Sequence, residues 1–415
     1  MKNAKNKSQL HIIADFYDCS KKPLKKKESI ETIFKNILKN AKLNVIHSKF
    51  YQFNPFGVTG FLLLKESHIS IHTWPENNSA AIDIFTCGNR KNARLAYKIL
   101  VEKLKPKRIE KKEINRFDKI SWFEDIYDKE KSLIQIKKKI FEKQTKFQKI
   151  QIFDTYKYKK IFAIDGEIQS AQTDEFIYHE SLVHPALLIH PNPANILIIG
   201  AGEGASGREI LKHNTIKKIT GIDIDKELIT IVKKYLKEWH QGAFDNKKYK
   251  LIIEDGRKFL EKTNEKFDII ICDLTDPVYN SPVRYLYTKE FYKLVKKALN
   301  KNGIFVTQAQ TIDPNKLKLH CSISKTLKSV FKNVKSYNVH VESFKALWGF
   351  LIASDNNINI DIDVDDILKK RNVKNLKHYN QETHNRMFLF PKYFKTKYKK
   401  NGRILTDKKP YSGGF

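Results

Sequence analysis

The second half of the chain alternates short apolar runs with longer segments whose apolar positions have helical spacing. The apolar runs cover residues 195–200, 218–223, 250–255, 267–273 and 303–308. Each run has the length of a buried strand and is bounded by polar or turn-forming residues. Strands that alternate with helices predict an α/β fold with a parallel, doubly wound sheet. Ligands bind such sheets at the carboxyl ends of the strands.

The first part of the chain shows a different pattern, in which strands and two helical segments are mixed. The predicted strands lie near His11, Asn44, Phe61 and Ala80, and the predicted helices span residues 29–42 and 92–104. The basic run over residues 103–112 is interpreted as a solvated helix end followed by a linker. This pattern predicts a separate α/β unit.

Between these two regions, apolar and polar residues alternate over residues 148–153 and 160–169. Strict alternation is typical of half-buried strands, so a small antiparallel sheet is predicted here. We therefore expect three domains, spanning residues 1–117, 118–172 and 173–415.

Composition narrows the classes of protein to consider. A chain of 415 residues can bury two or three cores. Its four cysteines, Cys19, Cys87, Cys272 and Cys321, are far apart and form no CxxC pair, which argues against a zinc site or a disulfide framework and fits a reducing cytosol. The polar first residues and the lack of a run of about 18 apolar residues predict a cytoplasmic protein that does not enter a membrane.

The net charge of +32 raises the question of a nucleic-acid partner. Lysine is spread along the whole chain instead of forming a patch, and no recognition motif accompanies it, so we expect no nucleic-acid partner. A strongly positive protein repels a cationic substrate, and such a substrate would need local carboxylates in its pocket.

One candidate site lies in the segment Glu66-Ser67-His-Ile-Ser-Ile-His72-Thr-Trp-Pro-Glu, which Phe-Thr-Cys87-Gly follows. A serine, a histidine or a cysteine taken alone is usually a packing residue. The ordered combination resembles the pyruvoyl-forming motif of bacterial-type S-adenosylmethionine decarboxylases. The opening run 11–19 and the turn 53–60 resemble the same family.

The resemblance implies a self-cleavage reaction in which the hydroxyl of Ser67 attacks the carbonyl of Glu66, and β-elimination leaves a pyruvoyl group at the position of Ser67. It implies that His72 is the base for elimination and that Cys87 protonates the decarboxylated carbon. Thr59 stands where we expect the family to have serine. A pyruvoyl carbonyl can form a Schiff base with the substrate and accept its electron pair, so no metal or separate cofactor is expected.

A second candidate site begins at the glycine loop Gly200-Ala-Gly-Glu203-Gly, which alone is weak evidence for a nucleotide site. Asp223 ends the next predicted strand and is placed to bind ribose hydroxyls. Asp273 and Asp276 follow a later buried strand. A hydride-transfer enzyme has no need of this pair, whereas a transferase that deprotonates an ammonium group and aims it at carbon does.

Taken with these motifs, residues 118–410 resemble the spermidine synthase family of aminopropyltransferases. Further stretches that carry the resemblance are 146–148, 165–169, 174–180, 184–185, 255–256 and 286–292. The resemblance implies that the nucleoside donor is held by Gln148, Glu203, Asp223, Asp255, Gly256 and Pro282. It implies that Gln169, Tyr178, His179 and Asp276 line the acceptor channel and that Asp273 is the base. Asp223 and Asp255 could instead only cap the ends of strands.

Together the two resemblances predict a bifunctional enzyme with a decarboxylase sandwich, a small β-sheet and a Rossmann-like, methyltransferase-like domain. It would decarboxylate S-adenosylmethionine and transfer the aminopropyl group to putrescine, giving spermidine and methylthioadenosine. Agmatine or spermidine remains an alternative acceptor, because Glu203 replaces the family's aspartate and residues 239–244 and 343–350 look more like the thermospermine and agmatine-using branch. Two further classes stay open for the second unit, a methyltransferase and a non-catalytic polyamine sensor. A homo-oligomer is expected by analogy.

Overall fold

The computed structural model describes residues 10–65, 67–115, 121–127, 130–277 and 281–412. The chain divides into two compact units, Met1–Ile120 and Ser121–Phe415. The predicted domain boundary between residues 117 and 118 lies outside the described residues. No helix within the described ranges is both long and apolar enough to cross a membrane.

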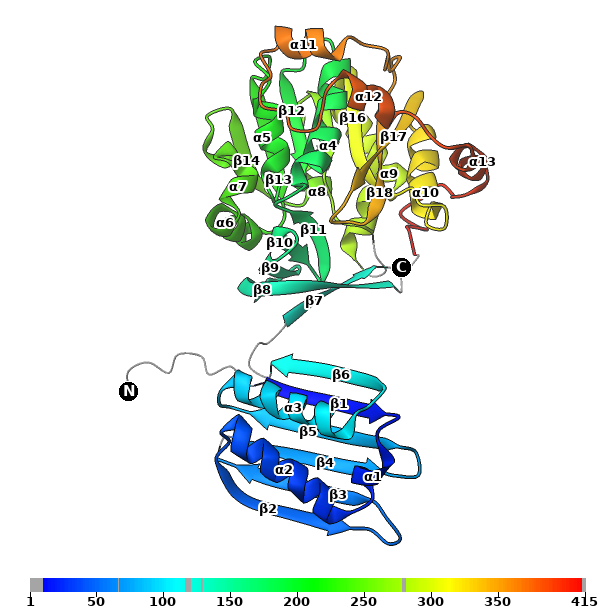
Figure 1. The fold of residues 1–415 in the computed structure, drawn as a ribbon. Helices are drawn as coiled ribbons and strands as arrows, with labels where there is room; N and C mark the ends of the chain where they lie inside the picture. Colours follow the sequence, from blue (N-terminus) through cyan, green and yellow to red (C-terminus); the bar gives the residue numbers. More distant parts are fainter. Residues whose placement is uncertain (1–9, 66, 116–120, 128–129, 278–280, 413–415) are drawn as a thin grey trace. The chain divides into compact units, whose positions relative to one another are not determined.

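The first unit is an antiparallel six-stranded sheet in the order β2-β3-β4-β5-β1-β6. Its strands are β1 (Leu10–Tyr17), β2 (Val45–Gln52), β3 (Val58–Leu64), β4 (Ser67–Trp74), β5 (Ser79–Thr86) and β6 (Arg108–Asn115). Its helices are α1 (Lys21–Leu24), α2 (Lys27–Ala41) and α3 (Arg90–Leu104). Helices α2 and α3 lie on the same face of the sheet (Figure 1).

Alternation along the strands explains why this unit has two unlike faces. In β4, Ile69, Ile71 and Thr73 are buried, whereas His68 and Ser70 are half-buried and His72 is exposed. The apolar side chains of the strands join Ile30, Phe34 and Ile37 of α2 in one core. The other face of the sheet therefore carries the polar members of the pattern.

One prediction for this unit is wrong. Residues 108–112 do not form a linker but belong to β6, which pairs with β1 along its whole length. The charged pattern misled the interpretation because β6 is an edge strand, where charged side chains are tolerated and discourage pairing with other chains. Arg108 lies over the ring of Tyr17 at 3.8 Å, and Glu113 accepts hydrogen bonds from Arg94.

The second unit begins with an antiparallel sheet in the order β11-β10-β9-β8-β7. Its strands are β7 (Ser121–Tyr127), β8 (Glu130–Gln144), β9 (Lys149–Thr155), β10 (Lys159–Ile164) and β11 (Glu167–Ala171). Its core contains Ile136, Phe153, Tyr158 and Ile161.

A seven-stranded sheet follows, in the order β14-β13-β12-β15-β16-β18-β17. Its strands are β12 (Asn195–Ile199), β13 (Lys218–Asp223), β14 (Tyr249–Ile253), β15 (Phe267–Cys272), β16 (Leu299–Thr311), β17 (Asn333–Val341) and β18 (Ala346–Ser354). The first five are parallel, and β18 runs antiparallel to both of its neighbours. The predicted α/β class and doubly wound sheet are confirmed, and the β17–β18 hairpin extends the five strands that the pattern indicated.

Helices cover both faces of this sheet (Figure 1). They are α4 (Glu175–Ile189), α5 (Ala205–Leu211), α6 (Lys226–Tyr235), α7 (Lys237–His240), α8 (Gly256–Lys262), α9 (Lys289–Ala298), α10 (Lys318–Lys328), α11 (Val364–Lys370), α12 (Gln381–Met387) and α13 (Lys392–Lys400), with short 3₁₀ helices η1 (Ala243–Asp245) and η2 (Pro282–Tyr287). Ile196 and Ile198 of β12 enter one core, and Leu197 and Ile199 enter the other. Burial on both faces accounts for the continuous apolar runs of these strands.

Candidate active sites

Ser67 is the first residue of β4, and β3 ends at Leu64. It is half-buried and pairs with Leu64 on one side and Thr86 on the other. Cys87 follows Thr86, so the register brings Ser67 and Cys87 to the same end of the sheet. The Thr86 hydroxyl accepts a hydrogen bond from the Gly88 amide at 3.0 Å, which stabilises the bend at Cys87. Glu66 lies outside the described residues.

His72 lies on the same strand but far from Ser67. Five residues of strand at about 3.3 Å each separate the two by roughly 16 Å. The His72 Nδ1 lies 2.9 Å from the Thr59 hydroxyl across the β3–β4 pair. The chain therefore brings Thr59 to His72, but it does not bring His72 to Ser67.

A different histidine lies beside Ser67. The Nδ1 of His68 is 3.4 Å from the Ser67 hydroxyl, and its Nε2 is 3.0 Å from Asp83 Oδ1. The other oxygen of Asp83 is 2.7 Å from His11 Nε2. The sequence motif assigns no role to His68, Asp83 or His11. The only feature of the sequence that could have pointed to their proximity is that each occupies a position on the polar face of its strand.

The second site lies at the carboxyl end of the parallel sheet. The loop after β12 begins at Gly200, which has a φ of +85° and approaches the end of strand β15 closely. A Cβ at this position would lie 2.1 Å from the Asp273 carbonyl oxygen, so only glycine fits. This close approach brings the Glu203 loop beside Asp273.

Asp273 is held by two hydroxyl groups. Tyr178 of α4 donates a hydrogen bond to its Oδ1 at 2.8 Å, and Ser206 of α5 donates to its Oδ2 at 2.7 Å. Burial raises the pKa of Tyr178 well above its ordinary value, with a further contribution from Asp273, so the phenol stays a donor. The Asp273 carboxylate is thereby fixed in orientation and can accept a proton from a bound amine.

Asp276 is held by two amides from β16. Gln308 donates to its Oδ1 at 3.1 Å, and Gln310 donates to its Oδ2 at 3.0 Å. Burial raises the pKa of Asp276 to about 6, and these hydrogen bonds oppose the rise. Gln308 also donates to the Leu274 carbonyl, which ties Asp276 to the loop after β15.

Glu203 is the last member of a row of buried, interacting charged side chains. It accepts a hydrogen bond from Ser170 at 2.6 Å and lies 4.0 Å from His179 Nε2. Burial opposes the protonation of His179, but the hydrogen bond and charge of Glu175 outweigh it and raise the pKa of His179 to about 9. Burial raises the pKa of Glu203 to about 7, although the His179 cation and Ser170 oppose this.

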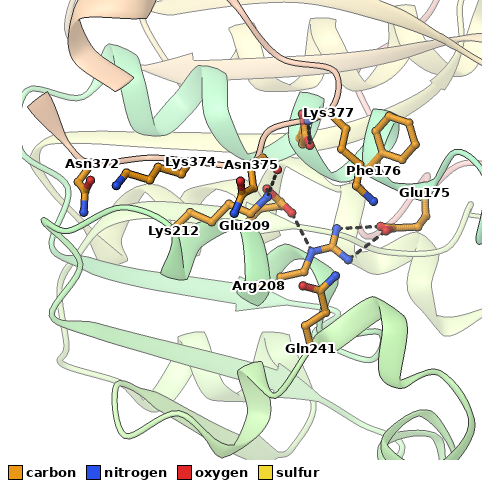
Figure 2. Close-up of a pocket in the computed structure, with 11 residues that line it drawn as sticks. Glu175, Phe176, Arg208, Glu209, Lys212, Gln241, Asn372, Lys374, Asn375 and Lys377 are labelled. Atoms are coloured by element: carbon orange, nitrogen blue, oxygen red, sulfur yellow. Dashed lines mark hydrogen bonds and ion pairs between the residues drawn. The ribbon is translucent and has the colours of Figure 1, made fainter. Parts of the chain in front are cut away.

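Glu175 is shared between His179 and Arg208. Its Oε2 lies 2.9 Å from His179 Nδ1, and both of its oxygens accept hydrogen bonds from the Arg208 guanidinium. Arg208 also pairs with Glu209 and lines a cavity of about 330 Å³ (Figure 2). The ion pairs seen there fix Glu175, and Glu175 in turn fixes the ring of His179.

Asp223 lies at the end of β13 and is buried. Burial raises its pKa to about 7, while backbone amides, including that of Asp225, oppose this. The Asp225 amide donates to Asp223 Oδ1 at 2.9 Å, and Gln148 donates to Asp225 Oδ2 at 3.2 Å. Gln148 and Asp223 are thus brought together through Asp225, which had no predicted role.

The remaining predicted residues have structural roles in the fold. Asp255 caps α8 by accepting hydrogen bonds from the amides of Arg257 and Lys258. Gly256 is packed so closely that a Cβ would lie 2.4 Å from Ile199. Pro282 begins η2. Gln169, the residue before Ser170, donates a hydrogen bond to the Glu167 carbonyl. A nucleoside or amine contact for these four residues stays a prediction.

Aromatic rings surround Tyr178, whose hydroxyl donates a hydrogen bond to Asp273. Tyr178 contacts Phe344 with a centroid distance of 5.8 Å and Phe350 with one of 5.4 Å, and Phe344 lies 4.8 Å from Trp348. Such rings suit the methylene chain of an aliphatic amine, while carboxylates bind its ammonium groups.

Apart from Tyr178 and His179, the side chains that hold the carboxylates in place were not predicted. They are Ser170, Glu175, Ser206, Arg208, Gln308 and Gln310. Glu175 lies within a stretch that carried the family resemblance, but nothing in the local pattern shows that it pairs with Arg208. Among the residues described, no cluster of histidine, cysteine and carboxylate side chains suits a metal ion.

Three family models match the chain. The S-adenosylmethionine decarboxylase model matches residues 10–117, the spermidine synthase tetramerisation domain matches residues 121–172, and the spermine/spermidine synthase domain matches residues 175–363.

Several known proteins are similar to the second unit. A polyamine aminopropyltransferase of Sulfurisphaera tokodaii is 48% identical over 278 residues, which make up 66% of this chain and 92% of that protein. The thermospermine synthase ACAULIS5 of Arabidopsis thaliana is 45% identical over 248 residues, which make up 58% of this chain and 72% of that protein. The crystal structure of spermidine synthase from Thermotoga maritima aligns with a TM-score of 0.63 at 30% identity, covering 68% of this chain and 95% of that one.

Proposed function

The chain belongs to the polyamine aminopropyltransferase family and carries an S-adenosylmethionine decarboxylase domain ahead of it, and on this premise we propose that one polypeptide performs two consecutive steps of polyamine synthesis. The first unit removes the carboxylate of S-adenosylmethionine. The second transfers the aminopropyl group of the product to an amine and releases methylthioadenosine. The observation that carries the transfer step is the hydroxyl-anchored Asp273 beside Glu203, in a protein of net charge +32.

For the first reaction, the residues around Ser67 fit a self-derived pyruvoyl group. Ser67 is the first residue of strand β4, so cleavage before it does not interrupt β4, and Cys87 lies at the same end of the sheet. When formed, the pyruvoyl carbonyl supplies the electron sink for decarboxylation. Cys87 would protonate the substrate carbon that loses carbon dioxide.

For the second reaction, the residues divide into a donor set and an acceptor set. Glu203 binds the ammonium of the decarboxylated donor, and Asp223 with Gln148 binds its nucleoside. Undecarboxylated S-adenosylmethionine would bring its own carboxylate close to Glu203 and Asp273, and this like-charge contact disfavours it. Asp273 takes the proton from the acceptor nitrogen, and Asp276 anchors the acceptor.

The acceptor that we propose is putrescine, which makes the product spermidine. Agmatine and spermidine are the competing candidates, and the similarity to a thermospermine synthase favours keeping spermidine among them. Competition among putrescine, agmatine and spermidine for the decarboxylated donor, with products separated by chromatography, tests the choice. Transfer to none of the three would contradict the assignment of the second unit.

The first site also requires a second copy of the chain. His72 is roughly 16 Å along β4 from Ser67 and cannot act on it within one chain. The sheet face that carries His72 also exposes Ile13, Phe61, Leu63 and Trp74, each between 38% and 42% exposed. An apolar face of this kind fits a partner copy that supplies its own His72 to Ser67.

Mixing two inactive variants tests this arrangement. Ser67→Ala and His72→Ala chains are each expected to stay uncleaved when produced alone. In a mixed oligomer, the His72→Ala chain keeps Ser67 and receives His72 from its partner, so it should be cleaved. The control is the His72→Ala chain produced with a Ser67→Ala, His72→Ala double variant. Full cleavage of His72→Ala alone would contradict the proposed role of His72.

Replacing Cys87 separates catalysis from cleavage. Cys87→Ala is expected to cleave normally but to decarboxylate at least tenfold more slowly, because no thiol is left to protonate the carbon. Electrophoresis under denaturing conditions measures the first property, and release of carbon dioxide measures the second. An unchanged steady-state rate would remove Cys87 from the mechanism.

The pKa of Glu203 predicts a pH dependence of donor binding. Because burial raises this pKa to about 7, the carboxyl is ionised above pH 7 and loses its charge as the pH falls below it. The kcat/KM for the decarboxylated donor is therefore expected to fall by up to about tenfold per pH unit below 7.

Methylthioadenosine is the matched ligand for a parallel titration of binding affinity, because it shares the nucleoside but lacks the aminopropyl group with its ammonium and the sulfonium charge. Any titration of Asp223 affects both ligands, so the ratio of their affinities isolates Glu203. In Glu203→Gln the ratio should be independent of pH. A ratio that is flat in the wild-type protein would contradict the role of Glu203.

A further inference from the structure

We propose that His68, oriented by Asp83 and His11, is the base that starts self-cleavage by taking the proton from the hydroxyl of Ser67. The proposal rests on the proposed self-cleavage of the first unit and assigns its first step. His68 touches the reacting oxygen, whereas Asp83 and His11 are positioning residues.

Three neighbouring strands build this group. Asp83 lies on β5 between His68 on β4 and His11 on β1, and all three side chains lie on the sheet face opposite α2 and α3. The register pairs both His68 and His11 with Phe85, two residues from Asp83 on the same face of β5. Both histidines therefore reach Asp83 diagonally, which is within range for side chains of this length.

The hydrogen bonds select a tautomer of His68. Asp83 Oδ1 lies 3.0 Å from Nε2, and an ionised carboxylate can only accept, so Nε2 carries the hydrogen. The neutral ring then has its lone pair on Nδ1, which is the atom 3.4 Å from the Ser67 hydroxyl. A serine, a histidine and a carboxylate in this sequence of contacts form the usual arrangement for activating a hydroxyl.

The surroundings hold the ring in place. His68 stacks on Phe61 at 6.1 Å and contacts Phe85 at 5.9 Å. Asp83 is itself anchored by His11, which is 7% exposed and lies 2.7 Å from Asp83 Oδ2. His68 thus has one face on an aromatic ring and one edge on a fixed carboxylate, which leaves Nδ1 as the edge that faces Ser67.

The step is balanced within the chain. The Ser67 hydroxyl proton moves to His68 Nδ1 while the oxygen bonds to the carbonyl carbon of residue 66. The bond from that carbon to the Ser67 nitrogen then breaks, and the imidazolium returns its proton to the leaving nitrogen. The amide has become an ester with a free amine, and His68 is neutral again. The negative charge of Asp83 stabilises the imidazolium in between.

This assignment divides the reaction between two histidines of one strand. His68 acts on the hydroxyl, before the ester exists. His72 of a partner copy acts on the ester, when the α-proton is removed. Loss of either histidine leaves an uncleaved chain, but only loss of His72 leaves an ester in it.

Hydroxylamine, which cleaves esters and spares amides, distinguishes the two stages. His68→Ala is expected to stay uncleaved and to resist hydroxylamine, and added imidazole should restore cleavage. The matched variant His72→Ala should also stay uncleaved but should split between residues 66 and 67 when hydroxylamine is added. Denaturing electrophoresis and mass spectrometry of the fragments measure both outcomes.

Asp83→Asn keeps the shape of the group but removes the charge, so cleavage is expected to slow at least tenfold. This variant also tests the proposal if His68→Ala does not fold. Wild-type cleavage rates in Asp83→Asn, or a hydroxylamine-sensitive ester in His68→Ala, would overturn the role of His68. A wild-type chain that never cleaves would instead remove the proposed function, and this proposal with it.

Discussion

Ser67→Ala is expected to remain a single polypeptide and to lose decarboxylation by about a thousandfold or more, because the hydroxyl that becomes the carbonyl electron sink is gone. The wild-type chain should separate under denaturing conditions into residues 1–66 and 67–415. The variant should show one band and release no carbon dioxide from S-adenosylmethionine. Its aminopropyl transfer from supplied decarboxylated donor should be unchanged, since Asp273 lies in the other unit.

The sheet predicts a further property of the cleaved protein. β1 and β3 lie in the first fragment, but β1 pairs with β5 and β6, and β3 pairs with β4, all from the second fragment. The two fragments should therefore stay together under native conditions and separate only on denaturation.

Ser70→Ala is the matched control, because Ser70 lies on the same strand and is half-buried like Ser67. It should cleave and decarboxylate normally. A Ser67→Ala chain that still decarboxylates, or a wild-type enzyme that does so uncleaved, would contradict the pyruvoyl mechanism.

Asp273→Asn is expected to lower the kcat of transfer by roughly 10²–10⁴ while the acceptor KM changes little. Near neutral pH, an aliphatic amine with a pKa near 10.4 is almost wholly protonated, so it has no lone pair until a base removes the proton. Asparagine can still accept the Tyr178 hydrogen bond, so the site should keep its shape. Steady-state kinetics with saturating decarboxylated donor measure the change.

Asp276→Asn is the comparison, and it should mainly raise the acceptor KM, by about tenfold, because in the proposed mechanism Asp276 anchors the cation without taking its proton. The single oxygen of asparagine can keep only one of the two hydrogen bonds that Gln308 and Gln310 donate to Asp276. Decarboxylation by the first unit serves as an internal check that each variant is folded. A loss of acceptor affinity alone in Asp273→Asn would remove its assignment as the base.

The position of the second candidate site in the fold was predictable because several of its residues follow strands that are visible as short apolar runs. Glu203, Asp223 and Asp273 each come at or after the end of such a run. In a parallel sheet these ends share one edge, so linear position alone indicates proximity. The side chains that hold the carboxylates were not predictable in this way. Gln308 and Gln310 lie 32 and 34 residues from Asp276, and Arg208 lies 33 from Glu175.

In the first unit, the difference between what the sequence predicted and what only the structure revealed is larger. The motif around Ser67, His72 and Cys87 led to the hypothesis of self-cleavage through its resemblance to a known family, since its residue types follow one another in a fixed order. It did not show that β4 separates Ser67 from His72, or that residues 108–112 form an edge strand. The contacts of Asp83 with His68 and His11 span 15 and 72 residues. Local periodicity determines helices, strands and their buried faces, because it follows from backbone geometry. Strand order and register decide which polar side chains meet, because pairing joins segments that are distant in the chain and leaves no local pattern.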